Sequence, residues 1–190
     1  MRRPFGKTAK PPTPQSLANA ALQYLGRFAA SEASLRRVLE NRLRRAALRN
    51  PAFAADAAAQ KALREAIEHI VEAHKRNGVI DDAAFAETKI NSLRRQGRSR
   101  RAIEQKLAAK GLVKGIVATA LDRHADGATA EEVEFKAALA LARRRRLGPF
   151  GKTTPDETRR RKEFATLARA GFSSTIARRV LQADAPAEWE

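Results

Sequence analysis

The chain of 190 residues has a formal net charge of +17, because 38 Lys and Arg residues stand against 21 Asp and Glu residues. This excess favours a polyanionic partner such as nucleic acid or a nucleoprotein, since neutralising phosphates releases condensed counterions. The absence of cysteine excludes disulfides, thiolate zinc sites and a cysteine nucleophile. No apolar run approaches the ~18–20 residues of a membrane span, and none near the N-terminus is typical of a secretion signal. We therefore expect a cytoplasmic protein without a membrane segment.

Aromatic residues are few, with eight Phe, one Tyr and one Trp in the chain. The predicted cores are therefore built from Leu, Ile, Val and Ala, a composition that suits thin helical modules. For the same reason we expect few of the aromatic platforms on which single-stranded nucleic acid stacks.

The N-terminal part of the chain predicts an arm and three helices. Residues 1–13 are basic and Pro-rich, which is typical of a disordered arm. Thr13 and Pro14 then provide an N-cap and N1 pair for a first helix that ends near Ala30. Its buried side is predicted to carry Leu17, Ala21, Leu22, Leu25 and Phe28. A second helix begins after Ser31 and stops at Asn50-Pro51, and a third runs from about Asp56 to Asn77-Gly78.

The fourth predicted helix begins at a hydrophobic staple. With Asp81 as the N-cap, Ile80 occupies the N′ position and Phe85 the N4 position. Asp81 and Asp82 also complement the positive end of the helix dipole. This helix is predicted to run to about Gln96. A fifth helix spans about Ser99 to Lys110 and a short sixth ends at Asp126-Gly127.

Capping boxes predict the start of the last group of helices. Thr129 and Glu132 form such a box for a seventh helix that runs to about Arg146. The segment Thr154-Pro155-Asp156-Glu157 predicts a second box for an eighth helix that ends at Ala170-Gly171. A ninth helix begins at about Ser173, and the tail after Ala183 is polar.

One pattern recurs three times: a helix, a tight turn, and a basic helix with an apolar residue at every fourth position. The turn and its stripe are Ser31 with Leu35, Leu39 and Leu43, then Gly97 and Ser99 with Ile103 and Leu107, then Gly171 and Phe172 with Ile176 and Val180. Such self-similarity predicts an all-α fold, an elongated array of three tandem three-helix (helix-turn-helix-like) repeats. The predicted parts are the arm at 1–13, repeats at 14–78, 79–125 and 126–184, and a flexible tail at 185–190.

Three stretches of the sequence match motifs of one bacterial family. Residues 78–86, Gly-Val-Ile-Asp-Asp-Ala-Ala-Phe-Ala, resemble the signature G-x-I-D-D-x-x-F-A. Gly97, Ile103, Leu107, Lys110 and Gly111 follow as in its G-x-x-x-I-x-x-x-L-x-x-K-G segment, and Leu167, Arg169, Gly171, Phe172 and Ser173 resemble its closing L-x-R-x-G-F-S motif. Together these motifs resemble the RecX family, the modulators of the RecA recombinase, over roughly residues 16 to 182.

The resemblance implies a cytoplasmic protein, a monomer of three-helix repeats, that binds in the groove of the RecA–DNA filament. It would restrain strand exchange, ATP hydrolysis and co-protease activity, with no catalytic residue, metal or cofactor to carry over. Its partners would be the RecA filament and single- or double-stranded DNA, bound without sequence preference. The structural signature residues are Gly78, Ile80, Asp81, Asp82, Phe85, Gly97, Gly111, Gly171 and Phe172.

Basic side chains gather near the turns of the predicted repeats. Between residues 143 and 162 nine Lys or Arg stand against two acidic residues, and the helix dipole explains only the part that lies at a helix C-terminus. We predict one discontinuous basic strip that faces phosphate or an acidic protein surface. The candidate residues are Arg36, Arg37, Arg44, Arg45, Arg94, Arg95, Arg98, Arg100, Arg101, Arg143, Arg144, Arg145, Arg146, Lys152, Arg159, Arg160, Arg161 and Lys162.

Other chemistries fit the sequence less well. Asp81 and Asp82 diverge at a helix start, which favours a cap over a metal site, and the three histidines lack the i, i+4 spacing of helical zinc ligands. Gly151-Lys152-Thr153 lacks the glycine that a phosphate-binding loop needs at the position of Arg146. The alternative that stays open is a stand-alone helical repeat protein that binds nucleic acid without sequence specificity and has no recombinase partner.

The staple yields a test of the predicted helix boundary. Phe85→Ala is expected to lower the free energy of unfolding by about 3 kcal/mol, because it removes a buried aromatic ring. Urea denaturation followed by circular dichroism measures the loss. A loss below about 0.5 kcal/mol would show that the helix begins elsewhere.

Overall fold

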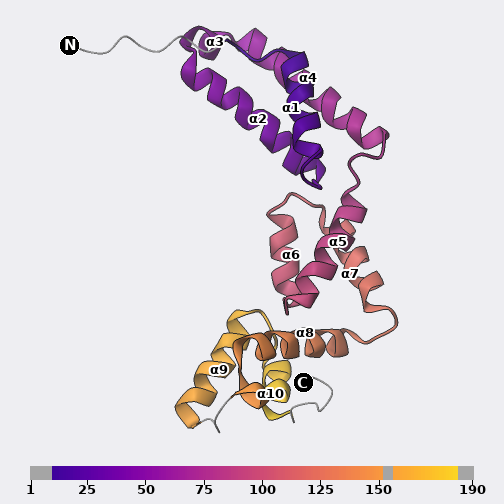
Figure 1. Cartoon of the computed structure of the whole chain (residues 1–190), viewed down its shortest axis with the longest axis vertical. Helices are drawn as coiled ribbons and strands as arrows, with labels where there is room; N and C mark the ends of the chain where they lie inside the picture. The colour runs from indigo at the N-terminus through magenta and orange to yellow at the C-terminus, as the bar shows by residue number, and fades with distance from the viewer. Residues whose placement is uncertain (1–9, 152–155, 184–190) are drawn as a thin grey trace, which may run out of the picture. The chain divides into compact units, whose positions relative to one another are not determined.

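The computed structural model describes residues 10–151 and 156–183, and within these ranges it contains helices and no strand (Figure 1). The elements are α1 (Pro14–Leu25), α2 (Glu32–Arg49), α3 (Pro51–Ala55), α4 (Ala57–Arg76), α5 (Asp82–Arg95), α6 (Arg100–Ala108), α7 (Lys114–Ala125), α8 (Ala130–Arg145), the 3-10 helix η1 (Gly148–Phe150), α9 (Glu157–Arg169) and α10 (Ser174–Gln182). The predicted all-α class is therefore confirmed. Residues 1–9 of the predicted arm and the tail at 185–190 lie outside the described residues.

The chain divides into two compact units. The first holds the described residues up to Phe85 together with Lys110–Leu112, and the second holds Ala86–Ala109 and the described residues from Val113 onward. The division falls within the residues predicted as the second repeat. The boundaries of the three repeats stay a prediction.

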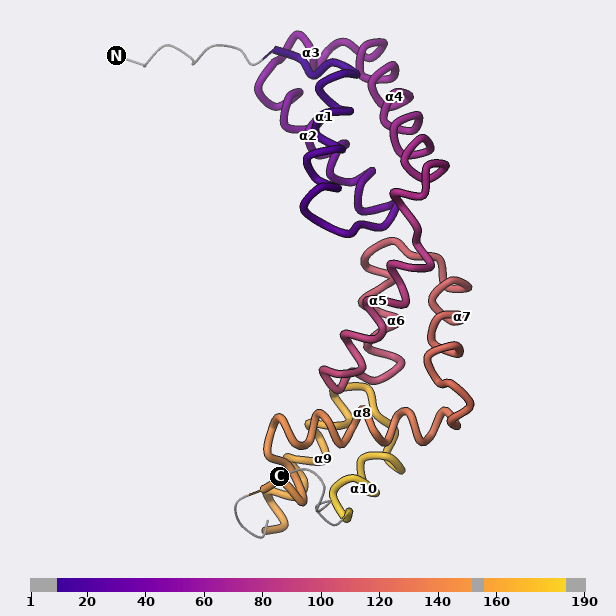
Figure 2. Tube along the Cα trace, turned by 45° about the vertical axis from the view of Figure 1, so that its right-hand side comes forward, coloured from indigo at the N-terminus to yellow at the C-terminus, as the bar shows by residue number. Residues whose placement is uncertain are grey.

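Three helices of the first unit, α1, α2 and α4, pack around one apolar core (Figure 2). Leu17 of α1, Leu35 and Leu39 of α2, and Ile67 and Val71 of α4 are each at most 1% exposed. Within each helix these positions lie about one turn apart, so each helix buries one stripe and leaves the rest of its surface to water. The predicted stripe of α2 is confirmed.

In the second unit, α8, α9 and α10 enclose a separate core. Leu167 of α9 and Val180 of α10 are fully buried. The small side chains of Ala138 and Ala142 on α8 belong to the same core. Ile103 and Leu107 give α6 its buried stripe, as the sequence predicts.

The first helix is shorter than predicted. Helix α1 ends at Leu25 with Gly26 as its C-cap, instead of running to about Ala30. Phe28 therefore lies beyond the helical stripe and is 57% exposed, and Leu22 is 59% exposed because it neighbours Ala21 on the other side of the helix. The prediction that both side chains are buried is wrong.

Two further boundaries differ from the prediction. The connection after Asn50-Pro51 contains its own short helix, α3, because the Asn50 side chain accepts a hydrogen bond from the Phe53 amide and Phe53 is buried. Helix α9 begins after Asp156, whose carboxylate accepts from the Arg159 amide at 2.7 Å. The predicted capping box at Thr154 is therefore wrong, and Thr154 itself lies outside the described residues.

Most predicted helix starts are confirmed. Ser31 and Ser99 cap α2 and α6, and Thr129 forms its capping box with Glu132. The Asp81 carboxylate accepts from the amides of Ala83 and Ala84 in the first turn of α5. The staple residues and the remaining aromatic signature residue are buried: Ile80 at 3%, Phe85 at 7% and Phe172 at 5% exposure. The signature glycines Gly78, Gly97, Gly111 and Gly171 all have positive φ.

The start of α2 is held by a pair of long-range hydrogen bonds. The Ser31 hydroxyl donates to the carbonyl of Lys110 at 2.9 Å, and the Asp82 carboxylate accepts from the Glu32 amide at 2.8 Å. The first amides of a helix have no partner within the helix, so these contacts satisfy groups that are otherwise unpaired. We call this arrangement the joint of α2.

The start of α6 repeats this arrangement. Ser99 donates to the carbonyl of Ala170 at 2.7 Å, and Glu134 accepts from the Arg100 amide at 2.8 Å. Each accepting carbonyl precedes a glycine, Gly111 in the first case and Gly171 in the second. Gly171 therefore corresponds to Gly111. The third copy of the pattern predicted from the sequence thus corresponds to the turn between α6 and α7, and not to the start of α2 or of α6.

The joint of α2 predicts a steric effect that can be separated from backbone strain. Gly111 has φ +81°, and a Cβ there would lie 2.2 Å from the Cβ of Ala33, whereas Gly127 has φ +78° and nothing within 4 Å. Gly127→Ala is expected to cost about 1 kcal/mol of unfolding free energy, because only the left-handed backbone is strained. Gly111→Ala is expected to cost a further 1–3 kcal/mol or so from overpacking.

Urea denaturation measures the free energy of unfolding of the Gly111→Ala and Gly127→Ala variants. Ala33→Gly in the Gly111→Ala background removes the clashing methyl group and is expected to recover part of the loss. Equal losses of unfolding free energy in the Gly111→Ala and Gly127→Ala variants would contradict the close packing of Gly111 against Ala33 in the joint of α2.

Candidate nucleic-acid interface

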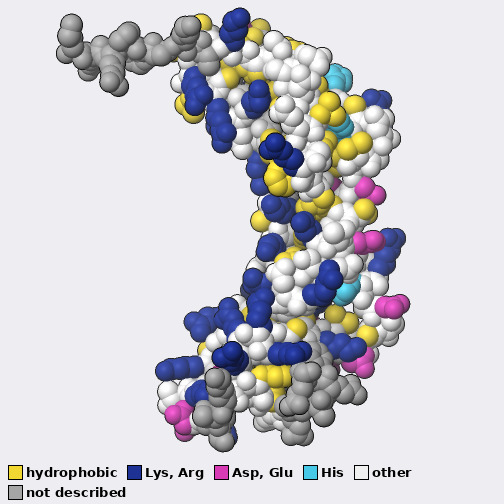
Figure 3. Space-filling model, in the orientation of Figure 1, with side chains coloured by type: hydrophobic (Ala, Val, Ile, Leu, Met, Phe, Trp, Pro, Cys, Tyr) yellow, Lys and Arg dark blue, Asp and Glu magenta, His cyan; other side chains and the backbone are white. Residues whose placement is uncertain are grey.

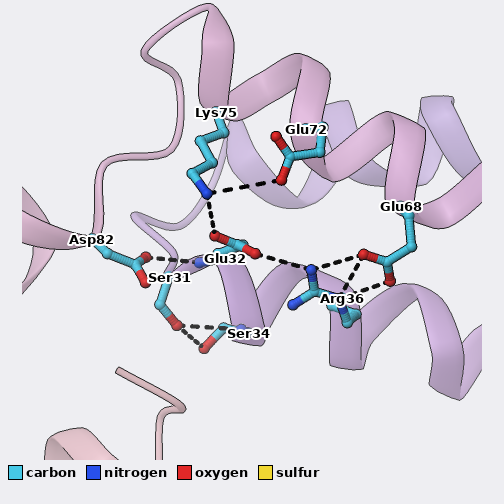
Figure 4. A network of polar contacts seen from close by, with 8 residues as sticks. All are labelled: Ser31, Glu32, Ser34, Arg36, Glu68, Glu72, Lys75 and Asp82. Carbon is cyan, nitrogen blue, oxygen red and sulfur yellow. Dashed lines mark hydrogen bonds and ion pairs between the residues drawn. The ribbon is translucent and has the colours of Figure 1, made fainter. Parts of the chain in front are cut away.

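Arg36 of α2 lies within a network of carboxylates (Figure 4). Its guanidinium group contacts Glu68 of α4 at 2.8 Å and Glu32 at 2.9 Å, and Lys75 contacts Glu32 at 3.1 Å. Hydrogen bonds from Arg36 and then Lys75 lower the pKa of Glu32, and a hydrogen bond from Arg36 lowers the pKa of Glu68. The same contacts, with that to Glu68 the stronger, raise the pKa of Arg36. The charge of Arg36 is thus neutralised within the fold.

The other predicted residues of α2 lie on its exposed surface. Figure 3 shows Lys and Arg side chains gathered over this helix. Arg37, Arg44 and Arg45 are exposed. Among the described residues no carboxylate pairs with Arg44 or Arg45, so both keep a full charge toward solvent.

The cluster at the α5–α6 turn divides in the same way. Arg94 is 9% exposed and donates to Glu134 at 2.6 Å and to the Arg98 carbonyl at 3.2 Å, so it supports the turn from inside. Arg100 contacts Asp122 at 2.9 Å and Glu104 at 3.0 Å, and the hydrogen bond to Asp122 is the main cause that raises its pKa. The cluster also contains exposed residues without a carboxylate partner in the described part of the chain, namely Arg95, Arg98 and Arg101.

At the end of α8, the predicted run Arg143–Arg146 is exposed throughout. Arg146 is the C-cap of α8 with φ 55°. Cations in the last turn interact favourably with the helix dipole, which partly explains their presence. Arg144 and Arg145 have no acidic partner in the ranges that the structure describes. This helix end therefore presents concentrated positive charge.

Helix α9 carries both paired and unpaired cations. Arg159 contacts Glu163 at 2.9 Å and Arg161 contacts Glu157 at 2.5 Å. Glu163 is 5% exposed and also accepts from the Gly148 amide at 3.0 Å, so it holds the loop between α8 and α9. Arg160 and Lys162 are exposed, whereas Lys152 lies outside the described residues.

The structure therefore brings the exposed cations together in local groups. The group on α2 belongs to the first unit, and the groups at the α5–α6 turn, at the end of α8 and on α9 belong to the second. In the second unit Figure 3 shows Lys and Arg side chains over α6 and around α9. A strip that joins all of these groups stays a prediction.

Several of the arginines predicted for the interface are instead paired with carboxylates of the fold. Some partners, Glu32, Glu104, Glu157 and Glu163, lie four residues from their arginine, a spacing that signals a helical ion pair. Glu68, Asp122 and Glu134 are 22 to 40 residues away from their partners. Such contacts have no local signal in the sequence.

The residues considered for metal binding form no site in the described part of the chain. Within it, no group of three or more His, Asp and Glu side chains is placed to hold a metal ion. Asp81 instead caps α5, and Asp82 belongs to the joint of α2. No helix among the described residues is both long enough and apolar enough to cross a membrane.

Tandem three-helix units with arginine-rich surfaces define a helical repeat protein, and three comparisons specify the family. Residues 81–121 match the family model described as "RecX, second three-helix domain". Regulatory protein RecX of Myxococcus xanthus (strain DK1622) is 41% identical over 174 residues, which cover 90% of this chain and 87% of that protein. Regulatory protein RecX of Agrobacterium fabrum (strain C58 / ATCC 33970) is 38% identical over 102 residues, or 54% of this chain and 51% of that protein.

The solved structures support the same fold. The crystal structure of RecX from Lactobacillus salivarius has a TM-score of 0.62 at 19% identity and covers 89% of this chain and 94% of that chain. A second crystal structure of regulatory protein RecX also has a TM-score of 0.62, at 22% identity, over 90% of this chain and 72% of that chain. The chain belongs to the RecX family of regulatory proteins, and the resemblance stated from its motifs is confirmed.

The network around Arg36 predicts how stability depends on pH. Because the pKa of Glu32 is lower in the folded than in the unfolded chain, its stabilising effect is present near neutral pH and is lost as the pH falls through the lowered pKa. Glu32→Gln is therefore expected to be less stable than the wild type at pH 7, and the difference shrinks between about pH 5 and pH 3.

Urea unfolding over this pH range measures the effect. Glu40→Gln is the control, because Glu40 is an exposed residue of the same helix with no cationic partner among the described residues. A difference between Glu32→Gln and the wild type that does not change with pH would contradict the assigned role of Glu32.

Proposed function

We propose that this protein binds the RecA–DNA filament and restrains the ATPase, recombinase and co-protease activities of RecA. Membership of a family of regulatory proteins named RecX supports the regulatory role. The observation that carries the binding proposal is the exposed arginines of both units, among them Arg44, Arg101 and Arg144, which have no carboxylate partner among the described residues. A filament of protein wound on DNA presents the matching phosphate charge along its length.

The interface that we propose is narrower than the predicted residue set. It consists of Arg44, Arg45, Arg95, Arg98, Arg101, Arg144, Arg145, Arg146, Arg160 and Lys162, whereas Arg37 and Arg143 stay candidates from the sequence. Arg36, Arg94, Arg100, Arg159 and Arg161 are left out, because each contacts a carboxylate of the fold. Lys152 stays a candidate by sequence alone.

The binding mode follows from the weakness of each contact. An exposed ion pair contributes about 1 kcal/mol or less, so affinity must come from many contacts made at once by groups in different helices. A protein that acts in this way needs no catalytic residue, and we propose a non-enzymatic, monomeric regulator in the cytoplasm. Its contact with DNA is expected to be independent of sequence, since arginine on phosphate reads no base.

A titration of RecA ATPase activity on single-stranded DNA tests the proposal. The protein is expected to suppress ATP turnover at amounts well below those of RecA, because one bound molecule affects a filament and not a single subunit. DNA binding without any effect on RecA turnover would instead support the alternative, a stand-alone nucleic-acid-binding repeat protein.

The double substitution Arg144→Gln with Arg145→Gln tests the interface itself. It removes two unpaired positive charges. Because glutamine is neutral, the substitution places no carboxylate at the C-terminal end of α8, where the helix dipole is negative. We expect about a tenfold higher concentration for half-inhibition. The log–log slope of DNA binding against salt is expected to be shallower by about 0.9 for each phosphate that the variant no longer neutralises.

A matched control changes the net charge by the same amount elsewhere. The double substitution Lys61→Gln with Arg76→Gln changes two residues of α4, a helix that also carries Glu65, Glu68 and Glu72. Equal effects of the two double variants would show that only net charge matters and would overturn the assigned interface.

A further inference from the structure

A groove of about 700 Å³ lies between α1 and α2 of the first unit. Its walls come from the segment before α1, from α1 and the residues that follow it, and from the middle and end of α2. The lining residues that carry the argument are Lys10, Tyr24, Arg27, Phe28, Arg42, Arg45 and Arg49. Of these, only Arg45 belongs to the residue set predicted from the sequence.

The groove is positively charged and contains no carboxylate. Five cations and no Asp or Glu are among its lining residues. Lys10, Arg27, Arg42, Arg45 and Arg49 also have no acidic partner elsewhere in the described residues. The groove on the other side of α2 differs, because Glu40 lies there beside Arg44 and Arg64.

Two aromatic rings stand in this groove. The centroids of Tyr24 and Phe28 are 5.5 Å apart with the rings tilted at 44°, so the two rings form one apolar surface. Phe28 is 57% exposed, although most apolar side chains of the first unit are packed in its core. An exposed ring beside unpaired arginines is the combination that binds single-stranded nucleic acid, by stacking of a base and contact with its phosphates.

We propose that the α1–α2 groove binds single-stranded nucleic acid, with a base stacked on Phe28 and the flanking phosphates held by Arg27, Arg42, Arg45 and Arg49. The side-chain amides of Gln23 and Asn41 line the same groove and provide donors and acceptors for a base edge. Its volume of about 700 Å³ is large enough for a nucleotide-sized group. An acidic peptide would engage the arginines but would leave the aromatic ring without a partner.

This inference rests on the nucleic-acid contact in the proposed function, and its test uses no RecA, so the two can fail separately. Fluorescence anisotropy measures binding of the full chain to a labelled oligothymidylate and to an abasic strand of the same length. The abasic strand keeps the phosphates but has no bases, so the difference in affinity reports the contribution of base stacking. Phe28→Ala is expected to weaken binding of oligothymidylate about tenfold and to leave binding of the abasic strand unchanged. Leu22→Ala is the control, since Leu22 is 59% exposed and lies outside the groove lining.

Arg45 and Arg64 give a second matched pair, because both are exposed and they line different grooves beside α2. Arg45→Gln is expected to lower the log–log salt slope for oligothymidylate by about 0.7, and Arg64→Gln to leave it unchanged. The proposal is overturned if Phe28→Ala weakens both strands equally, if Leu22→Ala has the same effect as Phe28→Ala, or if polyglutamate displaces the oligonucleotide at equal charge concentration.

Discussion

A serine hydroxyl and a carboxylate from distant parts of the chain hold the start of α2, and the same pair of contacts recurs at the start of α6. In the joint of α2 the carboxylate is Asp82, and at α6 it is Glu134. Helix starts expose amides that have no partner within the helix, so a buried start needs acceptors from elsewhere. Because α2 and α6 both carry exposed arginines, these contacts also fix where positive charge can be presented.

The distribution of carboxylates follows from this requirement. The chain has 21 acidic residues for 38 basic ones, and several of the acidic residues serve the fold: Asp82 and Glu134 at the helix starts, Glu163 at the α8–α9 loop and Glu32 beside Arg36. Too few carboxylates are left to pair with the exposed cations. The positive surface is therefore a consequence of how the few carboxylates are used, and not of net charge alone.

The aromatic residues show how composition can mislead. Ten aromatic residues in 190 suggest few stacking platforms, yet Tyr24 and Phe28 meet at the end of α1. Tyr24 lies in the last turn of α1, and Phe28 follows the C-cap Gly26 and so lies beyond the helix and its core stripe. One early helix end thus converts a residue expected in the core into part of a surface groove, beside arginines of α2 that are far from it in sequence.

Most helices, most of their N-caps and the family could be predicted from local patterns in the chain. Ser31, Asp81 and Thr129 cap helices as predicted, because a cap bonds amides two or three residues away. Periodic leucines mark buried faces for the same local reason. Which arginines are neutralised and which line a groove depends on how the helices pack together. Arg36, Arg94 and Arg100 each pair with a carboxylate that lies 22 to 40 residues away in the chain, and packing alone brings such groups together.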